Sequence, residues 1–205
     1  MLTKGNLYII SAPSGTGKTT LVRELVKSMP GIVVSVSHTT RLIRPQEKEG
    51  VDYHFVSKDE FNNMLKQKAF LEHAEVYNNL YGTARLWVEE ARLRGLDVIL
   101  EIDWQGARQV RELLVEAQSI FILPPSREAL YERLRKRLQD SDDIIKTRMA
   151  EATEQISHYM EFDYLICNDQ FEEALADLKA IVRAHRLHGR RQRAQLSLLL
   201  DEIVA

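Results

Sequence analysis

The sequence predicts an α/β protein of three layers, α/β/α, whose central and mainly parallel sheet lies between helices. Short runs rich in β-branched residues, typical of strands buried on both faces, recur at residues 7–11, 32–36, 98–102, 120–123 and 164–167. Longer amphipathic segments lie between most of these runs, at residues 18–29, 84–94, 107–117, 128–138 and 172–188. Strands that alternate with helices favour a parallel sheet.

Two regions interrupt this alternation. Residues 35–83 combine aromatic and polar residues with short extended pieces, and they predict an inserted small α+β subdomain. Residues 126–162 are charged and helical in pattern, and they predict a helical lid. The core is therefore expected to consist of residues 1–34, 84–125 and 163–205.

The composition indicates a soluble globular protein, with 205 residues of which 44% are hydrophobic and 28% charged. Its 28 basic and 30 acidic residues give a net charge of −2, so no global positive field favours nucleic acid or an anionic membrane. The apolar runs are far shorter than the ~20 residues that span a bilayer. The first of them ends at Ser11 and Pro13, which leaves no room for a signal-peptide core. We expect a cytoplasmic protein with small-molecule partners.

Two further features suggest structural roles. Cys167 is the single cysteine, which excludes an intramolecular disulfide framework and a multi-cysteine metal site, and we expect a buried, inert thiol. The basic tail at residues 183–193 runs into an apolar stretch at 196–200, for which we expect a solvated helix with one apolar packing face. The oligomeric state stays open, a homo-oligomer included.

The strongest motif is a phosphate loop at the end of the first strand. The segment Ser-Ala-Pro-Ser-Gly-Thr-Gly-Lys-Thr-Thr follows that strand and opens a helix, as such a loop requires. Glycines let backbone N–H groups turn toward phosphate oxygens, the lysine reaches the β and γ phosphates, and the hydroxyl after it suits Mg²⁺. The alternative is a strand-to-helix turn that binds nothing, which the Gly-Lys-Thr order disfavours. The residues expected to bind a nucleoside triphosphate are Ala12, Pro13, Ser14, Gly15, Thr16, Gly17, Lys18, Thr19 and Thr20, with Ala12 where the consensus has glycine.

Further motifs occur in order along the chain: residues 35–41, 44–45, 50–53, 70–74, 81–83, 103–106, 124–126 and 168–169. Together with the phosphate loop they resemble guanylate kinases of the bacterial type over nearly the whole chain. The resemblance implies a P-loop kinase that transfers a phosphoryl group in line from Mg²⁺-ATP to GMP, giving ADP and GDP, in purine nucleotide metabolism. It also implies that the inserted subdomain binds GMP.

The resemblance assigns the acceptor site residue by residue. Ser37, Glu72, Thr83 and Asp103 match residues that hold guanine, Arg41 and Arg44 match those that grip the acceptor phosphate, and Tyr53, Tyr81 and Gly82 belong to the same site. A carboxylate such as Glu72 can accept both neighbouring N–H donors of guanine, which adenine lacks. Without the resemblance, Glu72 is more typical of a surface carboxylate, and the tyrosines are more typical of core packing.

The donor side is assigned in the same way. Lys18, Arg41, Arg137 and Arg148 match catalytic cations that neutralise charge on the moving phosphoryl group, while Arg133 and Asn168 match residues beside the donor nucleotide. Thr19 and Glu101 match positions near Mg²⁺, the second through water, although the family usually has aspartate at position 101. Arg127 and Arg135 fit a solvated helix face better. The acceptor is already an anionic oxygen, so no general base is expected.

Two other functions stay open at this point. Guanylate-kinase-like domains also occur as catalytically silent binding modules, which the presence of Lys18, Thr19 and both acceptor-site arginines disfavours. A kinase for another monophosphate or a ribose phosphate is disfavoured by Glu72 and its two neighbouring hydroxyls.

Overall fold

The computed structural model describes residues 3–76, 78–138 and 142–205. These residues form a central five-stranded sheet in the order β2-β7-β1-β8-β9, with every pair of neighbours parallel. The strands are β1 (Leu7–Ser11), β2 (Ile32–Val34), β7 (Asp97–Glu101), β8 (Gln118–Leu123) and β9 (Tyr164–Cys167). The predicted α/β class and parallel sheet are confirmed.

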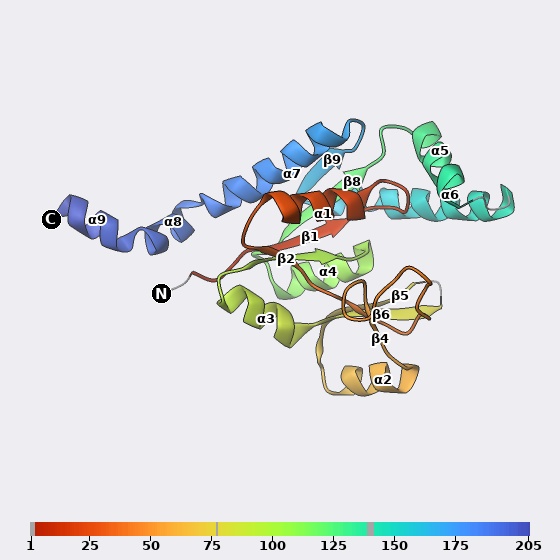
Figure 1. The fold of residues 1–205 in the computed structure, drawn as a ribbon, viewed down its shortest axis with the longest axis horizontal. Helices are drawn as coiled ribbons and strands as arrows, with labels where there is room; N and C mark the ends of the chain where they lie inside the picture. The colour runs from red at the N-terminus through yellow and green to blue at the C-terminus, as the bar shows by residue number, and fades with distance from the viewer. Residues whose placement is uncertain (1–2, 77, 139–141) are drawn as a thin grey trace.

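Helices cover both faces of this sheet (Figure 1). Helices α1 (Lys18–Ser28) and α7 (Phe171–Arg186) pack on the side chains of one face, among them Tyr8 and Ile10. Helices α3 (Arg85–Leu93) and α4 (Trp104–Leu113) pack on the opposite face, which includes Leu7 and Ile9. Because successive residues of a strand point to opposite faces and both faces are covered, β1, β7 and β8 contain consecutive buried apolar residues, whereas the edge strand β9 is only partly buried.

A second, smaller sheet lies beside the central one, in the order β4-β3-β6-β5 (Figure 1). Its elements are β3 (His38–Thr39), β4 (His54–Phe55), α2 (Lys58–Lys66), β5 (Phe70–Val76) and β6 (Asn79–Ala84). Helix α2 begins with a reciprocal capping box between Ser57 and Glu60. The small sheet and its helix are the α+β insertion that the composition of this region predicts.

Two helices form the predicted helical region at one end of the molecule (Figure 1): α5 (Arg127–Leu138) and α6 (Asp142–Ser157), followed by the short 3₁₀ helix η1 (Tyr159–Glu161). Leu130 and Leu134 of α5 are buried against Ile145 and Met149 of α6. This pair has a small apolar core of its own, and Ile156 of α6 packs against both this core and the core on the α3 and α4 face of the central sheet.

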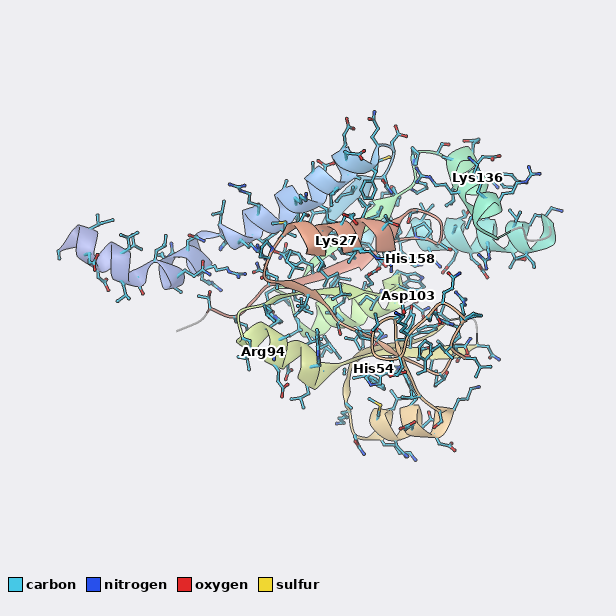
Figure 2. The ribbon with its side chains drawn as sticks, viewed as in Figure 1. Lys27, His54, Arg94, Asp103, Lys136 and His158 are labelled. Atoms are coloured by element: carbon cyan, nitrogen blue, oxygen red, sulfur yellow. The ribbon has the colours of Figure 1, made fainter. Side chains whose placement is uncertain are left out.

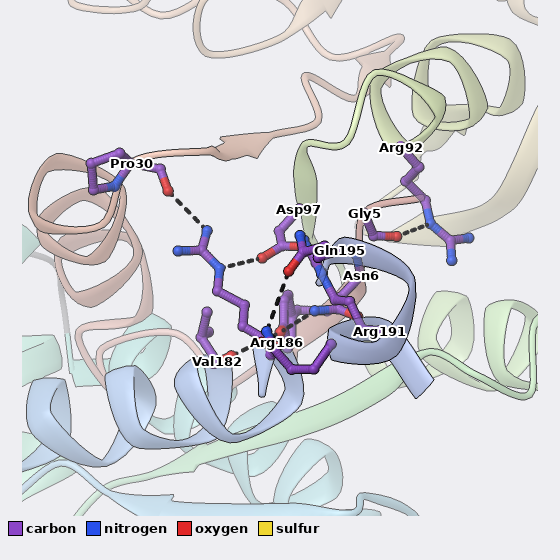
Figure 3. Close-up of polar contacts among 11 residues, drawn as sticks. Gly5, Asn6, Pro30, Arg92, Asp97, Val182, Arg186, Arg191 and Gln195 are labelled. Atoms are coloured by element: carbon purple, nitrogen blue, oxygen red, sulfur yellow. Dashed lines mark hydrogen bonds and ion pairs between the residues drawn. The ribbon is translucent and has the colours of Figure 1, made fainter. Parts of the chain in front are cut away.

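A buried carboxylate attaches the C-terminal helices to the sheet. Asp97, the first residue of β7, accepts hydrogen bonds from Nε of Arg186 at 2.7 Å, from Nη1 of Arg191 at 2.8 Å and from the backbone N–H of Asn6 at 2.7 Å (Figure 3). Arg186 also donates to the carbonyl of Pro30 at 2.9 Å. Arg186, the last residue of α7, is thus hydrogen-bonded both to the start of β7 and to the segment that precedes β2.

Two expectations about individual segments are wrong. The first is the apolar packing face expected at residues 196–200. Helices α8 (Gly189–Gln195) and α9 (Ser197–Val204) extend away from the body of the molecule (Figure 1), and the apolar side chains of α9 are exposed. Cys167 is also exposed, because it is the last residue of the edge strand β9. Among the residues that the structure describes, no helix is both long and apolar enough to cross a membrane.

Candidate functional site

The phosphate loop occupies the turn between β1 and α1. Gly15 and Gly17 have φ angles of 90° and 91°, a left-handed conformation that favours glycine. The hydroxyl of Thr16 donates to the carbonyl of Pro13 at 2.9 Å and closes the turn. Gly17 is the N-cap of α1, and no side chain caps the helix. The first N–H groups of α1 and the positive end of its dipole are thus available to an anion.

Glu101 brings a carboxylate to the start of α1. Its Oε2 accepts a hydrogen bond from the hydroxyl of Thr19 at 3.4 Å and lies 4.0 Å from Nζ of Lys18. Carboxylate and hydroxyl oxygens are ligands that suit Mg²⁺, which usually keeps several waters and takes phosphate oxygens as further ligands. Within the described ranges, no group of three or more His, Cys, Asp or Glu side chains is placed to hold a metal by itself. The residues at this point therefore fit an ion that arrives with a phosphate ligand.

The side chain of Asn168 is hydrogen-bonded to the backbone of the phosphate loop. Its Nδ2 donates to the carbonyl of Thr16 at 2.6 Å, and a methyl group on Gly17 would lie 2.6 Å from the same nitrogen. Arg133 of α5 donates from Nη2 to the Asn168 carbonyl at 3.0 Å. The side chain of Asn168 is thus engaged with the loop, and its role beside adenine stays a prediction.

Helix α5 packs directly on the loop. A Cβ added to Gly15 would meet Leu134 at 3.1 Å and Leu130 at 3.2 Å. Of the two arginines predicted to reach the moving phosphoryl group, Arg148 lies on α6. The side chain of Arg137 lies outside the described part of the chain. The catalytic roles of both arginines stay predictions.

The acceptor side centres on a buried chain of polar groups. The hydroxyl of Thr83 donates to Oε1 of Glu72 at 2.6 Å, and Oγ of Ser37 lies 3.4 Å from the same hydroxyl. Glu72 is 4% exposed, and this burial, with the nearby charge of Asp103, raises its pKa to about 7. The fold therefore brings the three predicted guanine-side residues of the insertion together around a poorly solvated carboxylate.

Asp103 lies between the two halves of the site (Figure 2). Its Oδ1 accepts the backbone N–H of Gly106 at 2.9 Å and caps α4, while its Oδ2 accepts a hydrogen bond from Nε2 of Gln105 at 3.4 Å. Burial raises the pKa of Asp103, whereas the Gly106 N–H and the charge of Lys18 lower it. Since Asp103 interacts electrostatically with both Lys18 and Glu72, it connects the phosphate loop with the acceptor side.

The predicted phosphate-gripping arginine is held by a carboxylate that the sequence did not single out. Nη2 of Arg41 lies 2.7 Å from Oε1 of Glu47, and the other oxygen of Glu47 accepts the backbone N–H of Arg44 at 2.9 Å. This hydrogen bond with Glu47 raises the pKa of Arg41 above the ordinary value of an arginine. The guanidinium lies 5.4 Å from the ring centroid of Tyr53, which packs edge-to-face with Tyr81 at 5.9 Å. The exposed side chain of Arg44 belongs to the same loop.

Glu47 had no signal in the sequence, because it stands among several charged and polar residues at 46–49 that show neither the helical nor the strand periodicity.

Gly82 has a packing reason for lacking a side chain, since an added Cβ would lie 2.9 Å from the ring of Phe70. A Cβ on Gly106 would lie 2.5 Å from Oε2 of Glu72. The sequence analysis singled out the Asp-Trp-Gln-Gly motif that contains Gly106, but the contact of Gly106 with Glu72 is visible only in the structure.

Comparisons with known proteins identify the family to which the whole chain is similar. The family model described as guanylate kinase matches residues 4–185. A guanylate kinase of Saccharophagus degradans is 54% identical over 205 residues, covering 100% of both chains. One from Pseudomonas fluorescens is 56% identical over 200 residues, covering 98% of this chain and 97% of its own. The crystal structure of guanylate kinase from Anaplasma phagocytophilum has a TM-score of 0.77 and 36% identity, and it covers 95% of this chain and 94% of its own.

Proposed function

The chain belongs to the guanylate kinase family, and we propose that it transfers the terminal phosphoryl group of Mg²⁺-ATP in line to GMP, giving ADP and GDP. The single observation that carries the choice of acceptor is the carboxylate of Glu72, which is buried and accepts the Thr83 hydroxyl. Two adjacent N–H donors of a guanine would satisfy this carboxylate.

ATP is placed by the phosphate loop in this proposal. The N-terminus of α1 and the backbone of residues 12–17 hold the phosphates, and Lys18 carries the positive charge toward the β and γ groups. Thr19 and, through water, Glu101 would hold Mg²⁺, which supplies charge neutralisation to the phosphates when bound. Arg133 and Asn168 close the donor side because they join α5 to the loop.

GMP is placed by residues 35–83 together with Asp103. Glu72, Thr83 and Ser37 face the base in this proposal, while Arg41 and Arg44 hold its phosphate with the phenols of Tyr53 and Tyr81. A guanidinium fork suits a phosphate better than an ammonium does. An adenine would leave the Glu72 carboxylate without its donors, and sites of this kind discriminate by roughly 10⁴ to 10⁵.

The chemistry needs position and charge more than proton transfer. The attacking atom is an anionic phosphate oxygen, so no side chain has to remove a proton. Lys18, Arg41, Arg137 and Arg148 would balance the negative charge as the phosphoryl group passes. The helix pair at residues 126–162 would close over the site and exclude water, which otherwise competes with GMP as acceptor.

The cellular setting follows from the same proposal. We place the protein in the cytoplasm, in purine nucleotide metabolism, with ATP and GMP as its partners and no role for nucleic acid or membrane. A homo-oligomer stays compatible with this function.

A coupled assay of ADP release tests the proposal with GMP, AMP, CMP and UMP as acceptors at fixed Mg²⁺-ATP. We expect turnover with GMP to exceed that with each of the others by orders of magnitude. Turnover with AMP comparable to that with GMP would refute the guanine assignment. Absence of turnover with every acceptor, in a protein that still binds ATP, would favour the silent binding module.

A further inference from the structure

The outer edge of β5 is held by a side chain of the core. Strand β5 is at one edge of the small sheet, so within the described part of the chain one row of its backbone groups has no strand partner. Gln109 of α4 fills this place at His73: its Oε1 accepts the His73 N–H at 3.1 Å, and its Nε2 donates to the His73 carbonyl at 2.7 Å. One planar side-chain amide thus pairs with both backbone groups of one residue, as a neighbouring strand would.

The same face of α4 meets β5 at successive turns. Asp103, the N-cap, is three residues before Gly106, which is three before Gln109, and residues three apart are neighbours on a helix surface. Asp103 caps the helix, Gly106 lies against the Glu72 carboxylate, and Gln109 binds the next residue along β5. The distance between the Glu72 and Asp103 carboxylates therefore depends on how β5 sits along α4.

Gly106 allows the close approach of Glu72 but cannot hold it, because it has no side chain. The paired hydrogen bonds of Gln109 are the directional contact beside it. We propose that Gln109 is a positioning residue for base recognition: by clamping His73 it sets Glu72 at the distance from Asp103 that a guanine requires. This inference rests on the proposed function, because guanine is the ligand whose affinity it explains.

The clamp needs the chemistry of glutamine. The amide has a donor and an acceptor on one plane, which match a carbonyl and an N–H of the same residue. A glutamate at this position would lack the donor and would place a negative charge beside the His73 carbonyl. A methionine has nearly the same length but makes neither hydrogen bond.

The test compares Gln109→Met and Gln109→Glu with a control, Glu112→Ala, which alters an exposed side chain of the same helix. KM for GMP, KM for ATP and kcat are measured for each, together with hydrogen exchange in residues 70–76. We expect KM for GMP to rise about three- to tenfold in both Gln109 variants, for the loss of one or two partly exposed hydrogen bonds. KM for ATP should stay within about twofold of wild type, and exchange at the His73 amide should quicken.

Two results would overturn the clamp while leaving the proposed function intact. The first is an unchanged KM for GMP in Gln109→Met, and the second is an equal rise in both KM values, which would indicate a general loss of structure. Failure of the wild-type protein to phosphorylate GMP would instead overturn the proposed function, and the inference with it.

Discussion

The hydroxyl of Thr83 donates a hydrogen bond to the carboxylate of Glu72 at 2.6 Å, across the antiparallel pair formed by β5 and β6. The two residues are direct partners in the register of that pair, so the sheet itself sets their separation. Burial raises the pKa of Glu72 to about 7, which means that this carboxylate is poorly solvated and gains from further N–H donors.

Replacing Glu72 by glutamine should impair the use of GMP and spare ATP. The glutamine oxygen can still accept from Thr83, but its NH₂ group would face the donors of guanine. We expect kcat/KM for GMP to fall by an amount equivalent to roughly 2 to 4 kcal/mol, as for lost charged hydrogen bonds. Steady-state kinetics measure this, with Glu75→Gln on an exposed position of β5 as the control. Unchanged GMP kinetics would show that Glu72 does not read the base.

The stability of the nucleotide-free protein should depend on pH through Glu72. The pKa is raised from 4.5 to about 7 on folding, so the folded state holds the proton more tightly. The resulting stability is fully present below pH 4.5 and is lost as the pH rises through about 7. Glu72→Gln cannot titrate, so its melting temperature should rise above that of wild type with increasing pH.

We compare the free energy of unfolding of wild type with that of Glu72→Gln. The difference between them should change by about 2 to 3 kcal/mol as the pH rises from 4.5 to about 7. Thermal melts at a series of pH values give the comparison. A constant difference from pH 4.5 to 8 would mean that Glu72 does not titrate in this range.

A methyl group at Gly106 should disturb base recognition. It would lie 2.5 Å from the Glu72 carboxylate, so the carboxylate must shift. In an ordinary helix the change from glycine to alanine stabilises by about 0.5 to 1 kcal/mol. We expect Gly106→Ala to raise KM for GMP at least about tenfold without a gain in melting temperature. The control is Gly189→Ala in α8, where the nearest atom is the end of Arg193 at 3.4 Å.

Glu47 should hold Arg41 ready for the acceptor phosphate. Glu47→Ala removes the 2.7 Å contact with Arg41 and the 2.9 Å bond to the N–H of Arg44. We expect a rise of about tenfold in KM for GMP, since Arg41 must then be ordered by the ligand. Gln46→Ala, at an exposed neighbouring position, is the control. Tighter binding of GMP would show instead that Glu47 competes with the phosphate for Arg41.

Asp97 should contribute to stability and not to chemistry. Its carboxylate is fully buried between Arg186 and Arg191, and removing one member of such a group leaves charges unpaired (Figure 3). We expect Asp97→Asn to lower the free energy of unfolding by about 3 to 5 kcal/mol. Denaturant melts measure this, and Glu24→Gln in the exposed pair with Lys27 should change it by less than about 1 kcal/mol. KM values at low temperature should match wild type.

The parts of the molecule that were predicted correctly have local signals. The runs at residues 7–11 and 164–167 coincide with β1 and β9, because apolar β-branched residues bounded by turn residues indicate a strand locally. The predicted burial on both faces is right for β1 and wrong for the edge strand β9, where Leu165 and Cys167 are exposed. The phosphate loop is equally local, since its glycines, lysine and helix start are contiguous. The wrong expectations for Cys167 and α9 concern burial, which depends on what lies opposite a side chain, and local sequence does not contain that information.

The sequence by itself determined the alternation of strands and helices, the phosphate loop and, through its ordered motifs, the resemblance to a family. Only the tertiary structure decided which distant residues meet: Glu72 with Gly106, Arg41 with Glu47, His73 with Gln109 and Asp97 with two arginines of the C-terminal helices. The physical reason is that periodicity reports which face of an element is apolar, whereas a polar contact between elements depends on the register in which they pack.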